Sequence, residues 1–312
     1  MRPRDREFVR RLDRGLRAFA RRHPVPGIRS AAGRKALLEQ LVESVRRVRY
    51  ISAVRTRGIS DLRADPSSEL FDPLKAAVLH HRAGRIDEAF WLVFLSVHFG
   101  KHRRAGWRLA RDVYGRLGGA SHWNWARTSA RPQQFRQWLA RNRVALQGDG
   151  VARHFGNHRK YQSLDAWSPT GTGAAIESYV RWVALCRSHH TRVQEALEET
   201  GRDPRRAFDR LYQSMHAVAT FGRTAKFDYL TMIGKLGFAA IEPGSTYLQG
   251  ATGPLAGARS LFGRSAAAAM TRREIDAWLV QLGADLDVGM HVVEDALCNW
   301  QKSPRRFKPF RG

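Results

Sequence analysis

Apolar residues recur at spacings of three and four along most of this chain. Three stretches show the spacing most clearly, at residues 37–51, 176–183 and 208–218. That period places the apolar side chains on one face of an amphipathic helix. Alternating apolar and polar positions, which are typical of strands, are scarce. The pattern therefore predicts an all-α fold.

One segment differs because it is apolar on every side. Residues 90–97 form this segment, which we interpret as a buried central helix. It is interrupted by Ser96 and is too short to span a bilayer. The arginine-rich stretch from Met1 to Arg22 lacks the apolar core of a secretory signal. We therefore expect a cytoplasmic protein that makes no membrane contact.

Clusters of Gly, Pro, Ser and Asp predict where the chain is divided. They fall at residues 63–73, 148–173 and 242–253. Together with the charge distribution they predict three parts: a basic N-terminal helical region at 1–68, a helical domain at 69–302, and a basic tail at 303–312.

The chain is strongly basic, with 54 Lys and Arg against 28 Asp and Glu and a formal net charge of +26. Nearly all of the excess lies in residues 1–63 and 101–161, which predicts a surface that binds polyanions, DNA above all. A generally basic, solvated surface is the alternative. The second block also contains aromatic residues that could stack on bases: Trp107, Trp123, Trp125, Phe135, Trp138, Phe155 and Tyr161.

Two polar segments rich in histidine and cations each contain one glycine, at residues 98–104 and 154–163. They could hold a phosphate or the edge of a base, although the second could also be a solvated basic loop. We expect a base pocket from Asn157, His158, Lys160 and Tyr161, and DNA contacts from Lys101, His102, Arg103 and Arg159. Acidic and cysteine ligands are absent from both segments, so we expect no metal, and nothing indicates another cofactor.

A glycine-containing turn between two apolar segments occupies residues 247–262. It resembles a helix-hairpin-helix, in which glycines and the N–H groups that begin the second helix approach a DNA phosphate. We therefore expect DNA contacts from Gly250, Thr252, Gly253 and Arg259. A plain connection between two helices is the alternative.

The segment 285–300 is the richest in carboxylates. If it were one helix, Asp287, His291, Glu294 and Asp295 would share one side and could perform general acid and base chemistry. The alternative is an acidic face that balances the charge of basic neighbours.

Three of these segments together resemble clade 3 of the alpha-glutamyl/putrescinyl thymine pyrophosphorylases: HFGKH at 98–102, FGNHRKYQSL at 155–164 and TGPLAGARSLFG at 252–263. The motif E-x-x-L-C at 294–298 resembles the wider group of helical enzymes that work on hypermodified thymine in phage DNA. The resemblance covers roughly residues 70–302. It implies a helical bundle related to the DNA glycosylases, some of whose bacterial relatives remove modified bases from phage DNA.

The resemblance implies a DNA N-glycosylase that excises a hypermodified base in anti-phage defence. Helix-hairpin-helix glycosylases carry a catalytic Asp about 20 residues beyond the hairpin, but no Asp lies at that distance from Gly253, and Asp276 comes late. We favour Asp287 as the catalytic carboxylate and Glu294 as the second candidate. No Lys follows the hairpin where a bifunctional enzyme would need one, which favours a monofunctional enzyme.

Two other functions remain open on the same residues. One is a transferase that builds hypermodified thymine in phage DNA by displacing pyrophosphate. The other is a basic protein that binds DNA or RNA without catalysis.

Overall fold

The computed structural model describes residues 5–148 and 150–309. Within these ranges the chain forms fifteen α-helices and several short 3-10 turns. No β-strand occurs in them, and the only strand-like feature is an isolated bridge between His102 and Gly106. The prediction of an all-α fold is confirmed.

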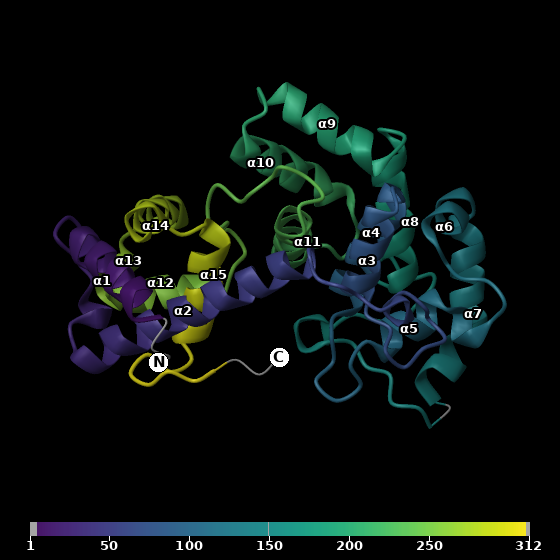
Figure 1. The fold of residues 1–312 in the computed structure, drawn as a ribbon, viewed down its shortest axis with the longest axis horizontal. Coiled ribbons are helices and arrows are strands. Elements are labelled where there is room, and N and C mark those ends of the chain that lie inside the picture. The colour runs from purple at the N-terminus through teal and green to yellow at the C-terminus, as the bar shows by residue number, and fades with distance from the viewer. Residues whose placement is uncertain (1–4, 149, 310–312) are drawn as a thin grey trace. The chain divides into compact units, whose positions relative to one another are not determined.

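The helices form two compact units. Unit 1 combines residues 5–53 with residues 242–309, and unit 2 contains residues 54–241. In Figure 1 the colours at the two ends of the bar, for residues 5–53 and 242–309, belong to unit 1, and the colours between them belong to unit 2. These limits differ from the sequence-based domain limits, because residues near both ends of the chain share one core.

Unit 1 has a single hydrophobic core to which both parts of the chain contribute. Leu12, Leu16 and Phe19 of the first part are buried there with Leu279 and Leu286 of the second. Its helices are α1 (Arg6–Ala20), α2 (Ala31–Val54), α12 (Gly253–Phe262), α13 (Arg264–Ala268), α14 (Arg272–Leu286) and α15 (Met290–Trp300).

Helices α12 and α15 approach each other closely because two glycines of α12 face α15. A Cβ atom at Gly257 would lie 2.4 Å from the Leu297 carbonyl oxygen, and one at Gly253 would lie 2.6 Å from Cys298 Sγ. Any larger residue at either position would push the helices apart. These glycines are therefore explained by packing inside unit 1.

Unit 2 is built around α4. Every residue from Glu88 to Phe99 in this helix is buried, so the predicted central helix is confirmed. The helices of the unit are α3 (Pro73–Arg82), α4 (Ile86–Phe99), α5 (Arg108–Tyr114), α6 (Trp125–Ala130), α7 (Pro132–Gly148), α8 (Thr172–Ala184), α9 (His189–Glu199), α10 (Pro204–Ser214) and α11 (Arg223–Lys235).

A chain of buried hydrogen bonds joins four helices of unit 2. Asp87 Oδ1 accepts from His189 Nδ1 at 2.6 Å, and His189 Nε2 lies 2.7 Å from the Tyr179 hydroxyl. The Tyr179 hydroxyl lies 2.8 Å from that of Tyr229. Because the Nδ1 proton of a neutral imidazole is directed at Asp87, Nε2 accepts from Tyr179, which in turn accepts from Tyr229. The chain thus fixes α4, α8, α9 and α11 to one another.

No helix within the described ranges has both the length and the apolar composition needed to cross a membrane.

Candidate functional site

Unit 2 brings together two of the segments that the sequence singled out. The turn after α4 and the loop at 154–161 meet through glycine backbone, where Gly156 N–H donates to the Phe99 carbonyl at 2.7 Å. A Cβ atom at Gly156 would lie 2.8 Å from the Gly100 carbonyl carbon. Gly100 also has φ +66°, a conformation that glycine adopts without strain. The two glycines are therefore what allows the two segments to touch.

Arg159 connects this loop to α4 and α11. Its Nε donates to the Val97 carbonyl at 2.7 Å, and a terminal nitrogen of its guanidinium lies 3.2 Å from Asp228 Oδ2. Only 10% of its side chain is exposed. We expected Arg159 on the surface as a DNA contact, but the loop turns it inward because the end of α4 offers it an unpaired carbonyl.

Asp228 of α11 is the carboxylate of this site. Its side chain is 47% exposed, yet protein surrounds it closely enough that desolvation raises its pKa above the ordinary value. Electrostatic interactions with Arg159, Arg223, His158 and Lys235 act in the opposite direction. A carboxylate that water can reach thus lies beside the Arg159 guanidinium and within electrostatic range of other basic side chains of α11 and of the 154–161 loop.

His98 supports the same loop from within unit 2. Its Nε2 lies 3.0 Å from Thr172 Oγ1, and that hydroxyl donates to the Ser163 carbonyl at 2.7 Å. Since the hydroxyl proton is used, His98 donates through Nε2–H. Burial first, and the charge of Arg159 second, lower the pKa of His98 to about 3, so the imidazole is neutral. His98 therefore has a positioning role in this site.

The four residues of the predicted base pocket all lie on the surface of unit 2. Asn157 and His158 belong to a 3-10 turn, Asn157–Arg159, and Tyr161 is 88% exposed with Lys160 Nζ 5.0 Å from the centre of its ring. Among the predicted DNA contacts, Lys101 and Arg103 are exposed and His102 is partly buried. All of these positions are accessible to a ligand, and their roles stay predictions.

Three of the seven aromatic residues that we expected to stack on bases are part of the core instead, and three more are partly buried. Trp123, Phe135 and Trp138 are buried, and only Tyr161 of that set is strongly exposed. Sequence reasoning missed Trp167, whose side chain is 55% exposed. It lies in the stretch at 148–173 that we interpreted as a linker because of its Gly, Pro and Ser content.

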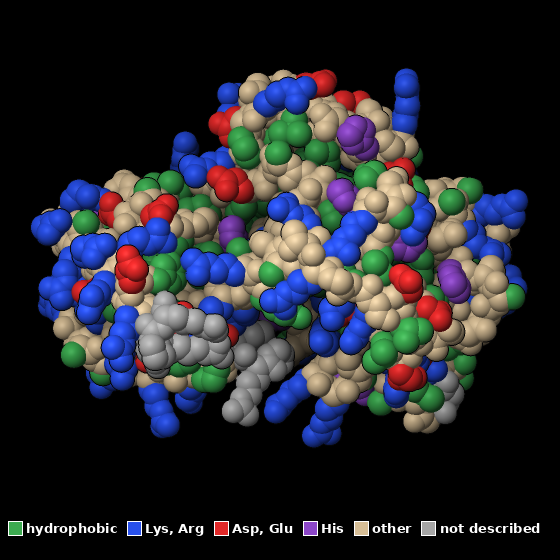
Figure 2. Space-filling view, viewed as in Figure 1, with side chains coloured by type: hydrophobic (Ala, Val, Ile, Leu, Met, Phe, Trp, Pro, Cys, Tyr) green, Lys and Arg blue, Asp and Glu red, His purple; other side chains and the backbone are tan. Residues whose placement is uncertain are grey.

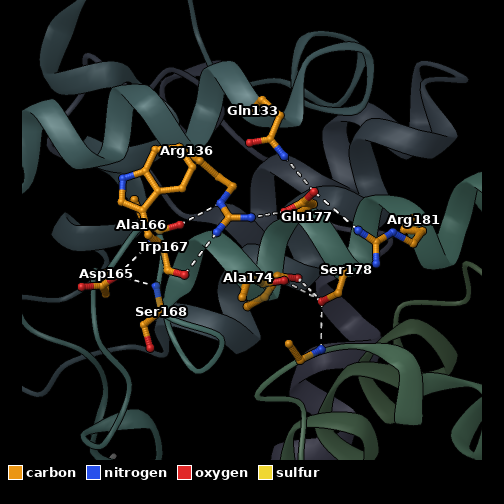
Figure 3. Close-up of polar contacts among 12 residues, drawn as sticks. Gln133, Arg136, Asp165, Ala166, Trp167, Ser168, Ala174, Glu177, Ser178 and Arg181 are labelled. Carbon is orange, nitrogen blue, oxygen red and sulfur yellow. Dashed lines mark hydrogen bonds and ion pairs between the residues drawn. The ribbon is translucent and has the colours of Figure 1, made fainter.

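Trp167 is held in a fixed position (Figure 3). The guanidinium of Arg136 lies 4.8 Å from the centre of its ring, and Arg136 Nε donates to the Ala166 carbonyl at 2.7 Å. Glu177 forms an ion pair with Arg136, and Asp165 Oδ1 accepts from the Trp167 N–H at 2.8 Å. Such a rigid, exposed indole is a suitable surface for stacking a nucleobase.

The carboxylates that we favoured from the sequence lie in unit 1. Asp287 ends α14 in a left-handed conformation, its side chain is 78% exposed, and it pairs with Arg11. Glu294 is partly buried on α15. The expectation that Asp287 shares a helix face with Glu294 is therefore wrong, because the chain leaves the helix at Asp287.

Other carboxylates of the same segment also pair with arginines of unit 1. Asp285 pairs with Arg22, and Asp295 pairs with Arg47 of α2. The geometry favours the second interpretation of this segment, in which its acids balance basic neighbours.

The turn at 247–262 does not have a helix on both sides. Residues 241–252 form no helix, and α12 begins only at Gly253, which packs against Cys298. The expected helix-hairpin-helix is therefore not formed by these residues. Gly250, Thr252 and Arg259 are exposed, and their contact with DNA stays a prediction.

A helix–turn–helix unit occurs instead between α10 and α11. Thr220 in its turn has φ +63°, and Gly222 is the N-cap of α11. The sequence signal is Phe221-Gly222-Arg223, which follows the amphipathic stretch at 208–218 and which we did not single out as a turn.

With this geometry established, the chain was compared with known proteins. It matches the family described as alpha-glutamyl/putrescinyl thymine pyrophosphorylase, clade 3, over residues 32–312. The chain belongs to this family. No match to a curated protein or to a solved structure was found.

The family assignment confirms the resemblance inferred from the sequence motifs and extends it toward the N-terminus. The matched range contains all of unit 2 and most of unit 1, so the Asp228 site lies inside the range that matches the family. The family name connects the protein with enzymes of hypermodified thymine.

Within the described residues, no three His, Cys, Asp or Glu side chains are grouped so that they could hold a metal ion. Cys186 and Cys298 do not form a disulfide with each other.

Proposed function

We propose that this member of the pyrophosphorylase family is a monofunctional DNA N-glycosylase that flips a hypermodified base out of phage DNA and excises it. The observation that carries the proposal is Asp228, an accessible carboxylate that lies beside the Arg159 guanidinium and within electrostatic range of Arg223, His158 and Lys235. Removal of the base leaves an abasic site, which would disable an invading phage genome. The protein would then act in cytoplasmic anti-phage defence.

Unit 2 also has the groups that base flipping needs. Extruding a nucleotide costs about a few kcal/mol, which phosphate contacts and stacking must offset. Exposed cations such as Lys101, Arg103 and Lys160 can contact phosphates, and Trp167 and Tyr161 can stack on bases. Figure 2 shows how widely Lys and Arg side chains are distributed over one face of the molecule, with fewer Asp and Glu between them.

In the chemical step, a carboxylate stabilises the positive charge that develops on the sugar and orients the attacking water. We assign this role to Asp228. Donors facing the base help it to leave as an anion, and Asn157, His158 and Lys160 are the candidates on the adjoining loop. Their exposed side chains can reach a flipped base.

Three other carboxylates are alternative candidates for the catalytic role that we assign to Asp228. Asp287 and Glu294 are the candidates from the sequence, although water screens the exposed charge of Asp287. Glu242 lies about 20 residues after Gly222, the spacing that glycosylases of the hairpin type show, if the turn before α11 is the hairpin of this protein.

The decisive experiment is single-turnover excision on phage DNAs of known base modification, with abasic sites revealed by heating in alkali. We expect Asp228→Asn to bind modified DNA as the wild type does and to excise at least 100-fold more slowly, since it loses an interaction made in the transition state. Asp209→Asn is the matched control, because Asp209 is exposed on the neighbouring α10.

Wild-type excision by Asp228→Asn would contradict the assignment. If only one of Glu242→Gln, Asp287→Asn and Glu294→Gln loses excision, the residue replaced in that variant is the catalytic carboxylate. If the wild-type protein binds DNA and changes none of the substrates, a non-enzymatic DNA- or RNA-binding function is favoured.

A transferase is the second candidate, and the family name favours it. The cations around Asp228 would then hold a pyrophosphate leaving group, and Asp228 would accept a proton from the incoming amine. Mass spectrometry of nucleosides from treated DNA distinguishes the two reactions, because transfer increases the mass of the base whereas excision removes the base.

A further inference from the structure

Two arginines of unit 2 meet at one hydroxyl group without a carboxylate to neutralise them. Arg116 lies in the 3-10 turn Arg116–Gly118, and Arg127 lies in α6. A terminal nitrogen of each guanidinium donates to the Ser121 hydroxyl oxygen. Within the described residues, neither arginine forms an ion pair, whereas Arg111, Arg136 and Arg153 of the same unit do.

The same two side chains lie against Trp123. Each guanidinium carbon is 5.2 Å from the centre of the indole ring. The ring is buried and packs edge-on against Phe135 at 5.3 Å and Trp138 at 5.9 Å, so it forms a rigid floor. The floor determines where both guanidinium groups lie.

Two hydrogen-bond donors in this cluster are unsatisfied. Arg116 Nε and Trp123 Nε1 are buried and have no partner within the described residues. A buried donor without an acceptor is unfavourable, and native structures pair nearly all such groups. The cluster therefore has more donors and more positive charge than the protein itself satisfies.

The backbone around Arg116 is unusual as well. Arg116 and Leu117 both have positive φ, +54° and +57°, and Gly118 follows at +82°. Non-glycine residues in this region are strained, and such strain is kept where the surrounding structure requires a particular side-chain position. Here it brings Arg116 toward Arg127 in spite of their like charges.

We propose that Arg116, Arg127 and Ser121 form a binding site for one phosphate group. A phosphate oxygen accepts from each guanidinium, and its negative charge replaces the repulsion between them by attraction. The hydroxyl of Ser121 is placed to donate to the same group. Burial and the charge of Arg127 lower the pKa of Arg116, which agrees with a cation that lacks a counter-charge.

This site is separate in residues from the one around Asp228, and it does not depend on the reaction catalysed there. The phosphate group could belong to the DNA backbone, or it could be free phosphate or pyrophosphate. The experiment distinguishes these sources with one set of variants.

The first arm measures thermal unfolding of the full chain in inorganic phosphate and in sodium chloride at equal ionic strength. The wild type should unfold at higher temperature in phosphate, because a ligand that binds the folded state stabilises it. Arg127→Gln should unfold at higher temperature than the wild type in chloride, since the repulsion is gone, and should lose part of the gain from phosphate. The control Arg205→Gln, at an exposed position of α10, should keep the wild-type gain.

The second arm titrates pyrophosphate and a DNA duplex against Arg116→Gln/Arg127→Gln and against the equally charged control Arg205→Gln/Arg206→Gln. A free-anion site predicts a loss of pyrophosphate affinity of tenfold or more in the first variant only. A backbone site predicts that the slope of log affinity for DNA against log salt falls by about 1 relative to the control. Either result supports the proposal.

Ser121→Ala keeps both positive charges. It tests whether the cluster binds a phosphate group even if the double arginine variant does not fold. It should weaken binding of the same ligand by several-fold with unchanged helix content by circular dichroism. If Arg127→Gln lowers the unfolding temperature in chloride and keeps the full phosphate response, the arginines only pack on Trp123 and the proposal is wrong. Pyrophosphate affinity and DNA salt slopes equal to those of the controls would also overturn it.

Discussion

Single side chains in unit 2 show where stability and function compete. Asp228 is desolvated enough that its pKa is raised, and Arg159 beside it has a lowered pKa for the same reason. Burial therefore disfavours the charged form of both groups, even though they lie 3.2 Å apart. A residue kept at such a cost to stability is a candidate for function.

This cost can be measured directly. Because the folded protein raises the pKa of Asp228, the ionised carboxylate is less favourable in the folded chain than in the unfolded chain at neutral pH. We expect Asp228→Asn to raise the unfolding temperature by a few degrees while abolishing turnover. Differential scanning calorimetry at pH 7 tests this, and an equal or lower unfolding temperature would show that the ion pair with Arg159 stabilises the fold.

His98 makes unit 2 sensitive to acid. Its pKa is about 3 in the folded protein against 6.5 in the unfolded chain, so the unfolded chain binds more protons between these values. The free energy of unfolding should therefore decrease as the pH falls below 6.5, with a slope that approaches about 1.4 kcal/mol per pH unit for this group. Urea unfolding between pH 6.5 and 4.5 measures the slope.

His98→Gln supplies the comparison, since the amide can still donate to Thr172 but does not titrate. Its slope should be smaller than that of the wild type by most of the His98 contribution. Parallel slopes for the two proteins would mean that His98 is already protonated, or free to become so, in the folded state.

At the level of single residues, the sequence predicted which polar segments belong to the candidate site better than it predicted which side chains are buried or exposed. The segments that contain Gly100 and Gly156 were singled out from the sequence as two separate polar segments, and the structure shows that they meet. Arg159 was not expected to be buried, and Trp167 was missed altogether. Both outcomes depend on contacts with residues distant in sequence, Val97 for Arg159 and Arg136 for Trp167, which periodicity does not reveal.

The apolar spacing in the sequence predicted where the helices lie, but it did not predict where they end. The stripes at 176–183 and 208–218 correspond to α8 and α10 with the turn after it. The acid-rich segment was expected to be one helix, but Asp287 adopts a left-handed conformation that ends α14, and α15 begins at Met290. Gly289 is the N-cap of α15, and a count of carboxylates does not reveal where one helix ends and the next begins.

The contact between α12 and α15 leads to a prediction at the scale of an element. Gly257→Leu should destabilise the protein by about 1–3 kcal/mol, because its side chain would overlap the Leu297 carbonyl. Ala256→Leu is the matched control, since Ala256 is exposed on the same helix and its replacement should cost less than about 0.5 kcal/mol. Chemical unfolding followed by circular dichroism measures both. A similar stability for the two variants would mean that α12 can shift away from α15 at little cost.

Charge and exposed aromatic residues act together on the scale of the whole molecule. Acids of unit 1 neutralise part of the N-terminal basic block, as the pairs of Arg11, Arg22 and Arg47 show. The exposed cations and the two accessible aromatic residues of unit 2 remain available to nucleic acid. The sequence predicted the two basic blocks, but it could not show that acids neutralise part of the first block, or which aromatic side chains of the second block are exposed.

Trp167→Ala should therefore weaken DNA binding at every salt concentration without changing the salt dependence, since stacking releases no counterions. We expect a loss of about 1–3 kcal/mol of binding free energy for a single-stranded or modified substrate. Lys160→Gln should instead reduce the slope of log affinity against log salt. Fluorescence anisotropy at several salt concentrations separates these effects, and a change of slope in Trp167→Ala would exclude simple stacking.

The sharing of one core by residues 5–53 and 242–309 has a consequence for synthesis of the chain. The ribosome releases α1 and α2 long before α12, α14 and α15, whereas all helices of unit 2 emerge consecutively. Unit 2 can therefore acquire its core while the apolar faces of α1 and α2 still lack their partners. Until the last helices arrive, those faces are exposed to chaperones and proteases, so the nascent N-terminal helices are the part of this protein most open to quality control.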